Sequence, residues 1–396
     1  MDISNLEKSY PQLLSNMAEN QYSKQYIDSV KREILWILKH KTNEFHTYED
    51  YYNLRCSCLQ TEKYKPYKII YGLIKHYDED EYYPNGEKQH PLFEKGSFYF
   101  LEKDFRDFVD LYKKNEKPLS KSTIKNRFSR LSCFLYYQQK LGKKTIADID
   151  ENSCLSYIRG ENGLCKFNAS AMTSLKTVLK IINTPASIKI NNWLPSIKSR
   201  RKNIQYLTVD EIKKIKKLLE SDSPLSKRDR AIGLLLYFTG IRACDISNLK
   251  FENIDWMKER IEIIQQKTKQ PLSIPLLVPV GNAIYDYATT ERPKINSSYV
   301  FLSMTKPFRK LSYTAIATAI TNNVYNSADI RMNATDRRGS HLFRHNFATS
   351  LLNSGISGAV ITDVLGHKSP FSINSYLYAD IKQLRECALS IEEFQK

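Results

Sequence analysis

Apolar residues recur every three or four positions along most of the chain, and this spacing predicts a protein built mainly from α-helices. Between Leu13 and His40 the apolar positions share one helical face, and a second series at 67–74 predicts another helix. A Pro-Asn-Gly turn at 84–86 closes this segment. We therefore assign residues 1–95 to an N-terminal helical domain.

Helical patterns continue in the next hundred residues and are typical of a small bundle. They cover Phe98–Tyr112, Lys121–Leu141, Ile146–Gly160 and Ala169–Ile182, so we assign 96–190 to a second helical domain. Residues 22–27 align weakly with 119–124. This similarity indicates either duplicated modules or the general likeness of amphipathic helices.

A basic segment follows the second domain. Residues 187–203 contain five basic residues, no acidic residue and a proline, a composition that is poor for a helix and suited to a linker. We place the linker at 191–205. It would either lie against a polyanion or act as a solvated tether.

A third domain, 206–396, begins with a clear helix start. Thr208 and Glu211 have the spacing of a capping box, and the helix should reach about Ser221. A second helix, Arg228–Thr239, should end at Gly240. Two short strands are expected at 260–265 and 271–276, the second at a sheet edge because of its prolines. Helices are expected to resume after residue 311, so the fold class is mainly α with a small antiparallel sheet.

The formal charge narrows the choice of partners. With 60 Lys and Arg against 43 Asp and Glu, the net charge of +17 favours a polyanion, either nucleic acid or an anionic membrane. No apolar run approaches the roughly 18–20 residues of a membrane span, so nucleic acid is the better match and no membrane partner is expected. The N-terminus has no signal-peptide pattern, and we expect a cytoplasmic protein.

The seven cysteines do not predict disulfides, since their number is odd and no C-x-x-C pair occurs. Cys56-Ser57-Cys58, with His40, His46 and His76 nearby in sequence, suggests a zinc site only weakly, because the spacing fits no usual ligand pattern. Incidental thiols are the simpler interpretation. We predict no metal and no cofactor.

Several reactive side chains occur in a distinctive order in the third domain. Thr-Gly-Ile-Arg242 is followed by Asp245, Lys267 falls in the turn between the predicted strands, and His341-x-x-Arg344 precedes Leu-Gly-His367 and, nine residues later, Tyr376. This order closely resembles the catalytic domain of the tyrosine recombinases, also called the phage integrase family. The resemblance covers about 206–379 and extends loosely to the preceding module, which is similar to the family's core-binding domain.

The residue types suit chemistry on a DNA phosphodiester. Attack on phosphorus builds negative charge on nonbridging oxygens, and Arg242 and Arg344 are candidates to bind them. Tyr376 is the candidate nucleophile, since a phosphotyrosyl bond conserves the energy of the broken linkage and needs no ATP. Tyr378 is an alternative two residues away, although the spacing from His367 favours Tyr376.

The resemblance implies roles for the remaining residues. Lys267 would be the general acid that protonates the departing 5′-oxygen, His341 would assist proton transfer, and His367 would hydrogen-bond the scissile phosphate. Asp245 would orient the active-site groups. His345 is expected to pack beside the site and support it.

We therefore predict a site-specific recombinase that acts on double-stranded DNA as a tetramer on paired sites, serves a mobile element, and associates with the nucleoid when bound. Accessory DNA-bending or directionality proteins are possible partners. A topoisomerase IB-like enzyme and a catalytically inactive DNA-binding protein remain alternatives. The tail 380–394 has an apolar stripe for docking on a neighbouring protomer or on its own domain. Candidate DNA contacts are Lys121, Lys125, Arg127, Lys198, Arg200, Arg201 and Lys202.

Overall fold

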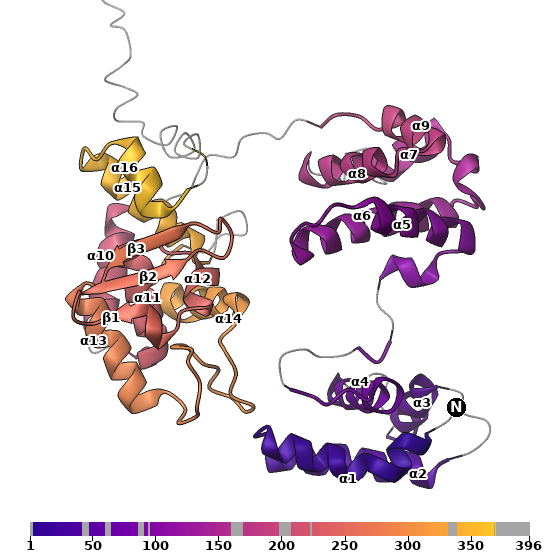
Figure 1. Cartoon of the computed structure of the whole chain (residues 1–396), viewed down its shortest axis with the longest axis horizontal. Coiled ribbons are helices and arrows are strands. Elements are labelled where there is room, and N and C mark those ends of the chain that lie inside the picture. Colours follow the sequence, from indigo (N-terminus) through magenta and orange to yellow (C-terminus); the bar gives the residue numbers. More distant parts are fainter. Residues whose placement is uncertain are drawn as a thin grey trace, which may run out of the picture. The chain divides into compact units, whose positions relative to one another are not determined.

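The computed structural model describes residues 3–41, 47–59, 65–85, 91–93, 96–159, 169–197, 207–221, 224–331, 339–367 and 369. Over these residues the chain is mainly helical with one small sheet, which confirms the predicted fold class (Figure 1). It divides into two compact units, built mainly from described residues between 32 and 197 and between 207 and 367. None of the described helices is long and apolar enough to cross a membrane.

Four helices form the N-terminal part of the chain. They are α1 (Ser4–Glu19), α2 (Lys24–Lys39), α3 (Tyr48–Cys58) and α4 (Lys65–Asp80). The single pattern expected from Leu13 to His40 is thus split between two helices, because Gln21 has a φ of +61° and a left-handed residue cannot continue an α-helix. Glu33, which is fully buried on α2, accepts hydrogen bonds from Arg55 at 2.9 Å and from the Tyr71 hydroxyl at 3.3 Å.

The next helices form a bundle around one apolar core, as the sequence predicts. They are η1 (Ser97–Phe100), α5 (Lys103–Asn115), α6 (Lys121–Lys140), η2 (Ile146–Asp148), α7 (Glu151–Ile158), α8 (Ala169–Ile182) and α9 (Pro185–Trp193). The prediction that 187–203 is poor for a helix is wrong for its first part, because α9 covers this part and packs Ile190 into the core. Side-chain caps fix their starts: Ser120 accepts from the Thr123 N–H at the start of α6, and Thr184 does the same for Ser187 before α9.

The second unit begins where the sequence predicts. The Thr208 hydroxyl accepts from the Glu211 N–H at 3.2 Å, and the Glu211 carboxylate accepts from the Thr208 N–H at 2.8 Å, which confirms the capping box of α10 (Val209–Glu220). Helix α11 (Lys227–Thr239) ends at Gly240 in the left-handed conformation, also as predicted. Both helices pack into a large apolar core.

The sheet is antiparallel with strand order β1-β2-β3. Its strands are β1 (Ile254–Asp255), β2 (Arg260–Ile264) and β3 (Pro271–Pro275), and β3 lies at the edge, as its prolines predict. The register pairs Ile261 with Ile274 on β3, and both side chains are buried. The described turn between β2 and β3 carries Lys267, which confirms that prediction.

The remaining elements complete the unit. They are α12 (Ala243–Ser247), η3 (Phe251–Asn253), α13 (Val278–Asp286), η4 (Tyr287–Glu291), α14 (Tyr313–Ala319), η5 (Ile320–Tyr325), α15 (His341–Asn353) and α16 (Gly358–Leu365). The expectation that helices resume only after residue 311 is wrong, because α13 lies between the sheet and that point. Helix α16 lies beside β3, and α15 packs on α11 (Figure 1).

Candidate active site

Arg242 lies between two helices, where the chain turns from α11 into α12. Gly240 makes this turn possible: its φ is +59°, and a Cβ at this position would lie 2.7 Å from Cδ1 of Phe347. The Arg242 Nη2 donates to the carbonyl oxygen of Gly366 at 3.5 Å. Its Nη1 is buried and has no hydrogen-bond partner within the described part of the chain. A buried guanidinium nitrogen in this state has donor capacity for an anion.

Arg344 is the most buried of the proposed catalytic side chains, with 3% of its surface exposed. From α15 it donates through Nη1 to the Gly240 carbonyl at 3.0 Å and through Nη2 to the Leu365 carbonyl at 2.7 Å. Both acceptors lie at the C-terminal ends of helices, where carbonyl oxygens lack intrahelical partners and the helix dipole favours a cation. The fold therefore holds two arginines around the end of α16.

Asp245 holds the turn that carries Lys267. Its carboxylate is 3% exposed, and Oδ1 accepts a hydrogen bond from the Gln266 backbone N–H at 2.8 Å. Lys267 itself is exposed. Asp245 thus contacts the residue next to the proposed general acid. The resemblance implies that Asp245 orients active-site groups, and in this structure the group that it contacts is the β2–β3 turn.

Gln265 is a site residue that the sequence analysis missed. It is fully buried, donates through Nε2 to the Leu365 carbonyl at 3.1 Å, and accepts through Oε1 from the Thr268 hydroxyl at 2.6 Å. The strand period could have revealed it, since Ile261 and Ile263 face inward and Gln265 is the next inward position. A polar residue there needs buried partners.

The three histidines differ in their surroundings. His341 is the first residue of α15 and is exposed, whereas His345, one turn later, is partly buried, with the two ring centroids 6.4 Å apart. His367 follows Gly366, which ends α16 in the left-handed conformation. Burial, with the charges of Arg344 and Arg242, lowers the pKa of His367 from 6.5 to about 4. A neutral imidazole at this position can donate one hydrogen bond from one ring nitrogen and accept one at the other.

The structure brings part of the predicted set together. Arg242, Arg344 and His367 meet at the end of α16, and Asp245 contacts the Lys267 turn. Tyr376 and Tyr378 lie outside the described residues, so their predicted roles stay predictions. The same applies to the tail 380–394 and to the linker candidates Lys198, Arg200, Arg201 and Lys202.

The three DNA-contact candidates on α6 fall into two groups. Lys121 and Lys125 are exposed, one turn apart. Arg127 instead donates from Nη1 to both carboxylate oxygens of Glu116, at 3.0 and 2.9 Å. Its guanidinium is therefore already engaged by an anion of the protein.

The described residues contain no group of three His, Cys, Asp or Glu side chains that could hold a metal ion. Of the residues weighed as zinc ligands, Cys56 is buried and Cys58 is exposed, while His46 lies outside the described residues. The donor set at the end of α16 consists of cationic and neutral nitrogen groups, which suits an anion rather than a metal ion.

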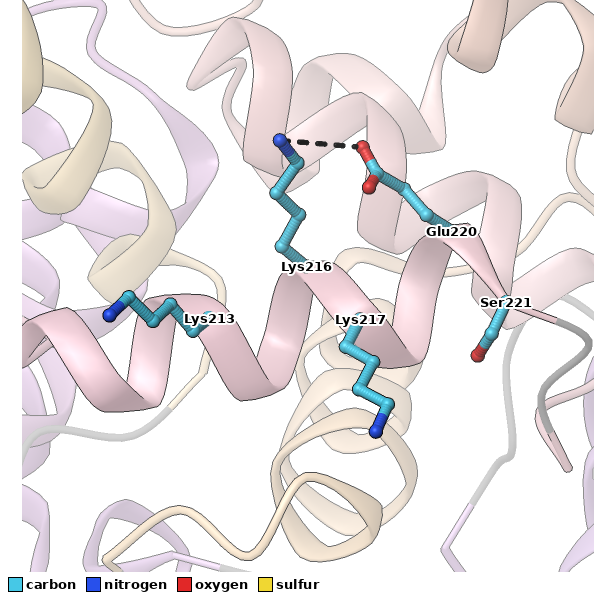
Figure 2. A pocket seen from close by; sticks show the side chains of 5 residues that line it. All are labelled: Lys213, Lys216, Lys217, Glu220 and Ser221. Atoms are coloured by element: carbon cyan, nitrogen blue, oxygen red, sulfur yellow. Dashed lines mark ion pairs between the residues drawn. The ribbon is translucent and has the colours of Figure 1, made fainter.

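A second surface feature lies on α10 and at its C-terminal end. Lys213, Lys216, Lys217, Glu220 and Ser221 line an open hollow of about 450 Å³ (Figure 2). Lys216 lies 3.9 Å from Glu220 one turn later, an ordinary exposed ion pair of a solvated helix. This hollow contains none of the predicted catalytic residues.

A family model and the curated relatives of this chain point to the same family. The model of the phage integrase family matches residues 205–383. The provisionally named integrase/recombinase y4gC of Sinorhizobium fredii is 34% identical over 171 residues, which cover 43% of this chain and 85% of that protein. Tyrosine recombinase XerC of Staphylococcus aureus (strain MSSA476) is 25% identical over 282 residues, covering 70% of this chain and 92% of XerC.

Solved structures share the fold at low sequence identity. The Tn1549 transposon integrase in complex with transposon right end DNA has a TM-score of 0.53 at 16% identity, covering 71% of this chain and 99% of that one. A lambda integrase dimer bound to a COC′ core site has a TM-score of 0.51 at 18% identity, covering 70% of this chain and 77% of that one.

Proposed function

The chain belongs to the phage integrase family and is a tyrosine site-specific recombinase, and from that premise we propose that it cleaves and rejoins DNA strands through a covalent 3′-phosphotyrosyl intermediate on Tyr376. One observation carries this proposal. Arg242 and Arg344 both donate to the end of α16, while Arg242 Nη1 is buried with no hydrogen-bond partner among the described residues. That nitrogen is available to a nonbridging phosphate oxygen.

The two arginines and His367 are proposed to bind the scissile phosphate. Two guanidiniums, which stay protonated at all relevant pH values, stabilise the charge that develops on the nonbridging oxygens. His367 is neutral at pH 7, since its pKa is about 4. In this neutral form it can donate one further hydrogen bond to the phosphate.

The covalent step exchanges one phosphate ester for another. The Tyr376 oxygen attacks phosphorus, the bond from phosphorus to the 5′-oxygen breaks, and the phosphate remains attached to the 3′ end of the strand. His341 helps to move the phenol proton, since a free tyrosine has a pKa near 10. Lys267 donates a proton to the departing 5′-oxygen. Reversal with a new 5′-hydroxyl joins the strands and needs no cofactor.

DNA is held by both helical domains and the linker. We propose the boundaries 1–95, 96–190, 191–205 and 206–396, except that α9 reaches Trp193 and Leu194 packs in the bundle core, so the linker begins after Leu194. The basic linker is proposed to lie against the phosphates. Lys121 and Lys125, exposed one turn apart on α6, are proposed phosphate contacts. Arg127 is the weakest of these candidates because Glu116 already neutralises it.

The family and one solved structure support a proposal for the biological setting. A solved relative is a transposon integrase in complex with transposon end DNA, and this supports the integration or excision of a mobile element as the role. We propose a tetramer on paired sites, with accessory DNA-bending proteins, acting in the cytoplasm at the nucleoid. The apolar stripe of the tail, 380–394, is proposed to contribute to contacts between protomers.

Trapping of the covalent intermediate tests the proposal. Wild-type protein is incubated with a nicked target site in excess chelator, and the protein–DNA adduct is measured on a denaturing gel. We expect adduct with the wild type and none with Tyr376→Phe, which keeps the ring but lacks the attacking oxygen. Tyr378→Phe is the matched control and should form adduct like the wild type.

Other outcomes separate the alternatives. Adduct in Tyr376→Phe but not in Tyr378→Phe moves the nucleophile by two residues. Adduct with supercoil relaxation but no recombinant product indicates a topoisomerase-like activity. Absence of any adduct in the wild type refutes the covalent mechanism, and a requirement for a divalent metal ion contradicts the phosphate chemistry described above.

A further inference from the structure

The carbonyl oxygen of Leu365 joins two parts of the site that are separate in sequence. It accepts from Arg344 Nη2 at 2.7 Å and from Gln265 Nε2 at 3.1 Å. Arg344 belongs to the proposed phosphate-binding side, whereas Gln265 lies two residues before Lys267. A single acceptor at the end of α16 therefore connects the phosphate side with the turn of the proposed general acid.

The orientation of the Gln265 amide follows from its neighbours. A backbone carbonyl only accepts, so the nitrogen must face Leu365, and the oxygen then accepts from the Thr268 hydroxyl at 2.6 Å. This hydroxyl lies on the other side of Lys267 from Gln265. The side chain thus closes the turn across Lys267 and attaches it to α16 at the same time.

Close packing fixes Gln265 in this position. It is fully buried, and a Cβ on Gly366 would come within 2.4 Å of its Nε2. The second anchor of the turn, the hydrogen bond from the Gln266 N–H to Asp245, holds the backbone from the opposite side at α12. A turn held at both sides restricts where the exposed Lys267 side chain can reach.

From these contacts we infer that Gln265 is a positioning residue that sets Lys267 against the leaving 5′-oxygen by tying the β2–β3 turn to the end of α16. The inference rests on the proposed function, since it needs Lys267 to act as the proton donor. Misplacement of a catalytic group by about 1 Å costs on the order of 100-fold in rate, so loss of this anchor should be visible in the cleavage step.

The chemistry of the leaving group gives a specific test. A 5′-oxygen must be protonated as it departs, whereas a sulfur in the same bridging position leaves as a thiolate, because a thiol has a pKa near 8.5. Loss of a correctly placed acid therefore slows cleavage of the oxygen-linked site and spares the sulfur-linked site. A general loss of folding or of phosphate binding slows both.

The experiment measures cleavage at saturating DNA on two target sites that differ only in the bridging 5′ atom, which is oxygen in one and sulfur in the other. Four proteins are compared: the wild type, Gln265→Met, Lys267→Ala and Ile264→Met. Gln265→Met keeps the length of the side chain and removes its hydrogen bonds. We expect it to slow cleavage of the oxygen substrate about 10- to 100-fold and to cleave the sulfur substrate at the wild-type rate, with unchanged affinity for DNA. Lys267→Ala should show the same recovery on the sulfur substrate. Ile264→Met, on the exposed face of β2, should resemble the wild type on both substrates.

A gentler variant covers the case in which Gln265→Met does not fold. Thr268→Val removes only the hydroxyl that donates to Gln265 Oε1, at a partly buried position of the turn. It should produce a smaller defect with the same recovery on sulfur. Equal defects on oxygen and sulfur, or no defect on oxygen, overturn the inference while the wild type still cleaves. If the wild type forms no adduct on either substrate, the proposed function fails first and the inference fails with it.

Discussion

Two arginines, the partly buried Arg127 and the buried Arg344, show how differently this molecule uses the same side chain. In the helical bundle, Arg127 donates to both oxygens of Glu116, and the two formal charges cancel. In the second unit, Arg344 donates to the neutral carbonyls of Gly240 and Leu365. A carbonyl oxygen accepts a hydrogen bond from a guanidinium without cancelling its positive charge. The type of acceptor, a carboxylate or a carbonyl, therefore distinguishes a purely structural arginine from one that belongs to an anion site.

The neighbouring groups respond to this difference. Hydrogen bonding to Glu116 raises the pKa of Arg127. The positive charge of Arg127 therefore stabilises the ion pair with Glu116. Beside Arg344 and Arg242 the case is different: burial, with the positive charges of these two arginines, lowers the pKa of His367 to about 4. A helix end is well suited to this purpose because its carbonyls favour cations without neutralising them.

The largest effect should follow from changing the shape of an arginine while keeping its charge. Arg242→Lys retains one positive charge but loses the planar fork and the buried Nη1 donor. We expect cleavage to fall by about 10²–10³-fold, the usual cost of removing one donor to a developing oxyanion, with little change in DNA affinity. Single-turnover cleavage and a binding titration measure the two quantities. Cleavage close to the wild-type rate would place the phosphate elsewhere.

The corresponding change in the bundle should affect stability and leave the chemistry intact. Arg127→Met leaves the carboxylate of Glu116, which is 5% exposed, without its cation. We expect a loss of about 2–3 kcal/mol in the free energy of unfolding, less than for a fully buried pair because Arg127 keeps 19% exposure. Denaturant unfolding measures the loss.

The double variant Arg127→Met with Glu116→Gln removes both charges and should recover part of this stability. Both proteins should cleave DNA at the wild-type rate when assayed well below their unfolding temperature. A large cleavage defect with normal stability would show instead that Arg127 contacts DNA, in spite of its ion pair.

The smallest predicted effect is a titration that reports the charge at the end of α16. His367 has a pKa of about 4 in the folded protein against 6.5 when unfolded. The unfolded state therefore binds more protons between these values, so the contribution of His367 to stability is complete above pH 6.5 and is lost as the pH falls towards 4. Stability of wild type and His367→Gln, compared across this range, should show a shallower pH dependence in the variant.

The same histidine should sense both its neighbours and its ligand. Replacing Arg242 with Gln removes one of the charges that lower the pKa of His367, so this pKa should rise. Binding of a DNA phosphate should raise it as well. Proton NMR of the imidazole follows both changes, and a pKa that stays near 4 in each case would contradict the arrangement of charges described here.

Much of the second unit could be predicted because its signals are local. The Thr208 cap, the end of α11 at Gly240 and the edge strand with its prolines all depend on neighbouring residues. The motif order around Arg242, Lys267, Arg344 and His367 could be read as well, since each motif has its own short pattern. The meeting of Arg242, Arg344 and His367 at α16 then follows from the fold.

Other features depend on contacts that no short pattern reveals. Gln265 looks like an ordinary polar residue beside Gln266. Its role becomes visible only from its buried position directly after β2 and from its hydrogen bond to the distant Leu365 carbonyl. The pairing of Arg127 with Glu116, eleven residues earlier, likewise turns a predicted DNA contact into a partly buried ion pair. Helix α13 was missed although Pro279 lies in its first turn, a position that proline favours.

The prolines of β3 also determine how this sheet behaves in solution. The backbone N–H of Gln265 donates to the Gln270 carbonyl, and that of Leu276 donates to the Glu259 carbonyl. With the register of the strands, this directs the backbone N–H and C=O groups of the even-numbered residues of β3 towards β2. The backbone groups of residues 271, 273 and 275 then point away from β2. Pro271 and Pro275 have no N–H, which leaves Ser273 as the one outward donor of the strand. A further strand would find the outward carbonyl oxygens but only this one N–H donor, so it could form only an incomplete ladder there. The edge should therefore resist aggregation when copies of the protein are crowded together on one DNA molecule.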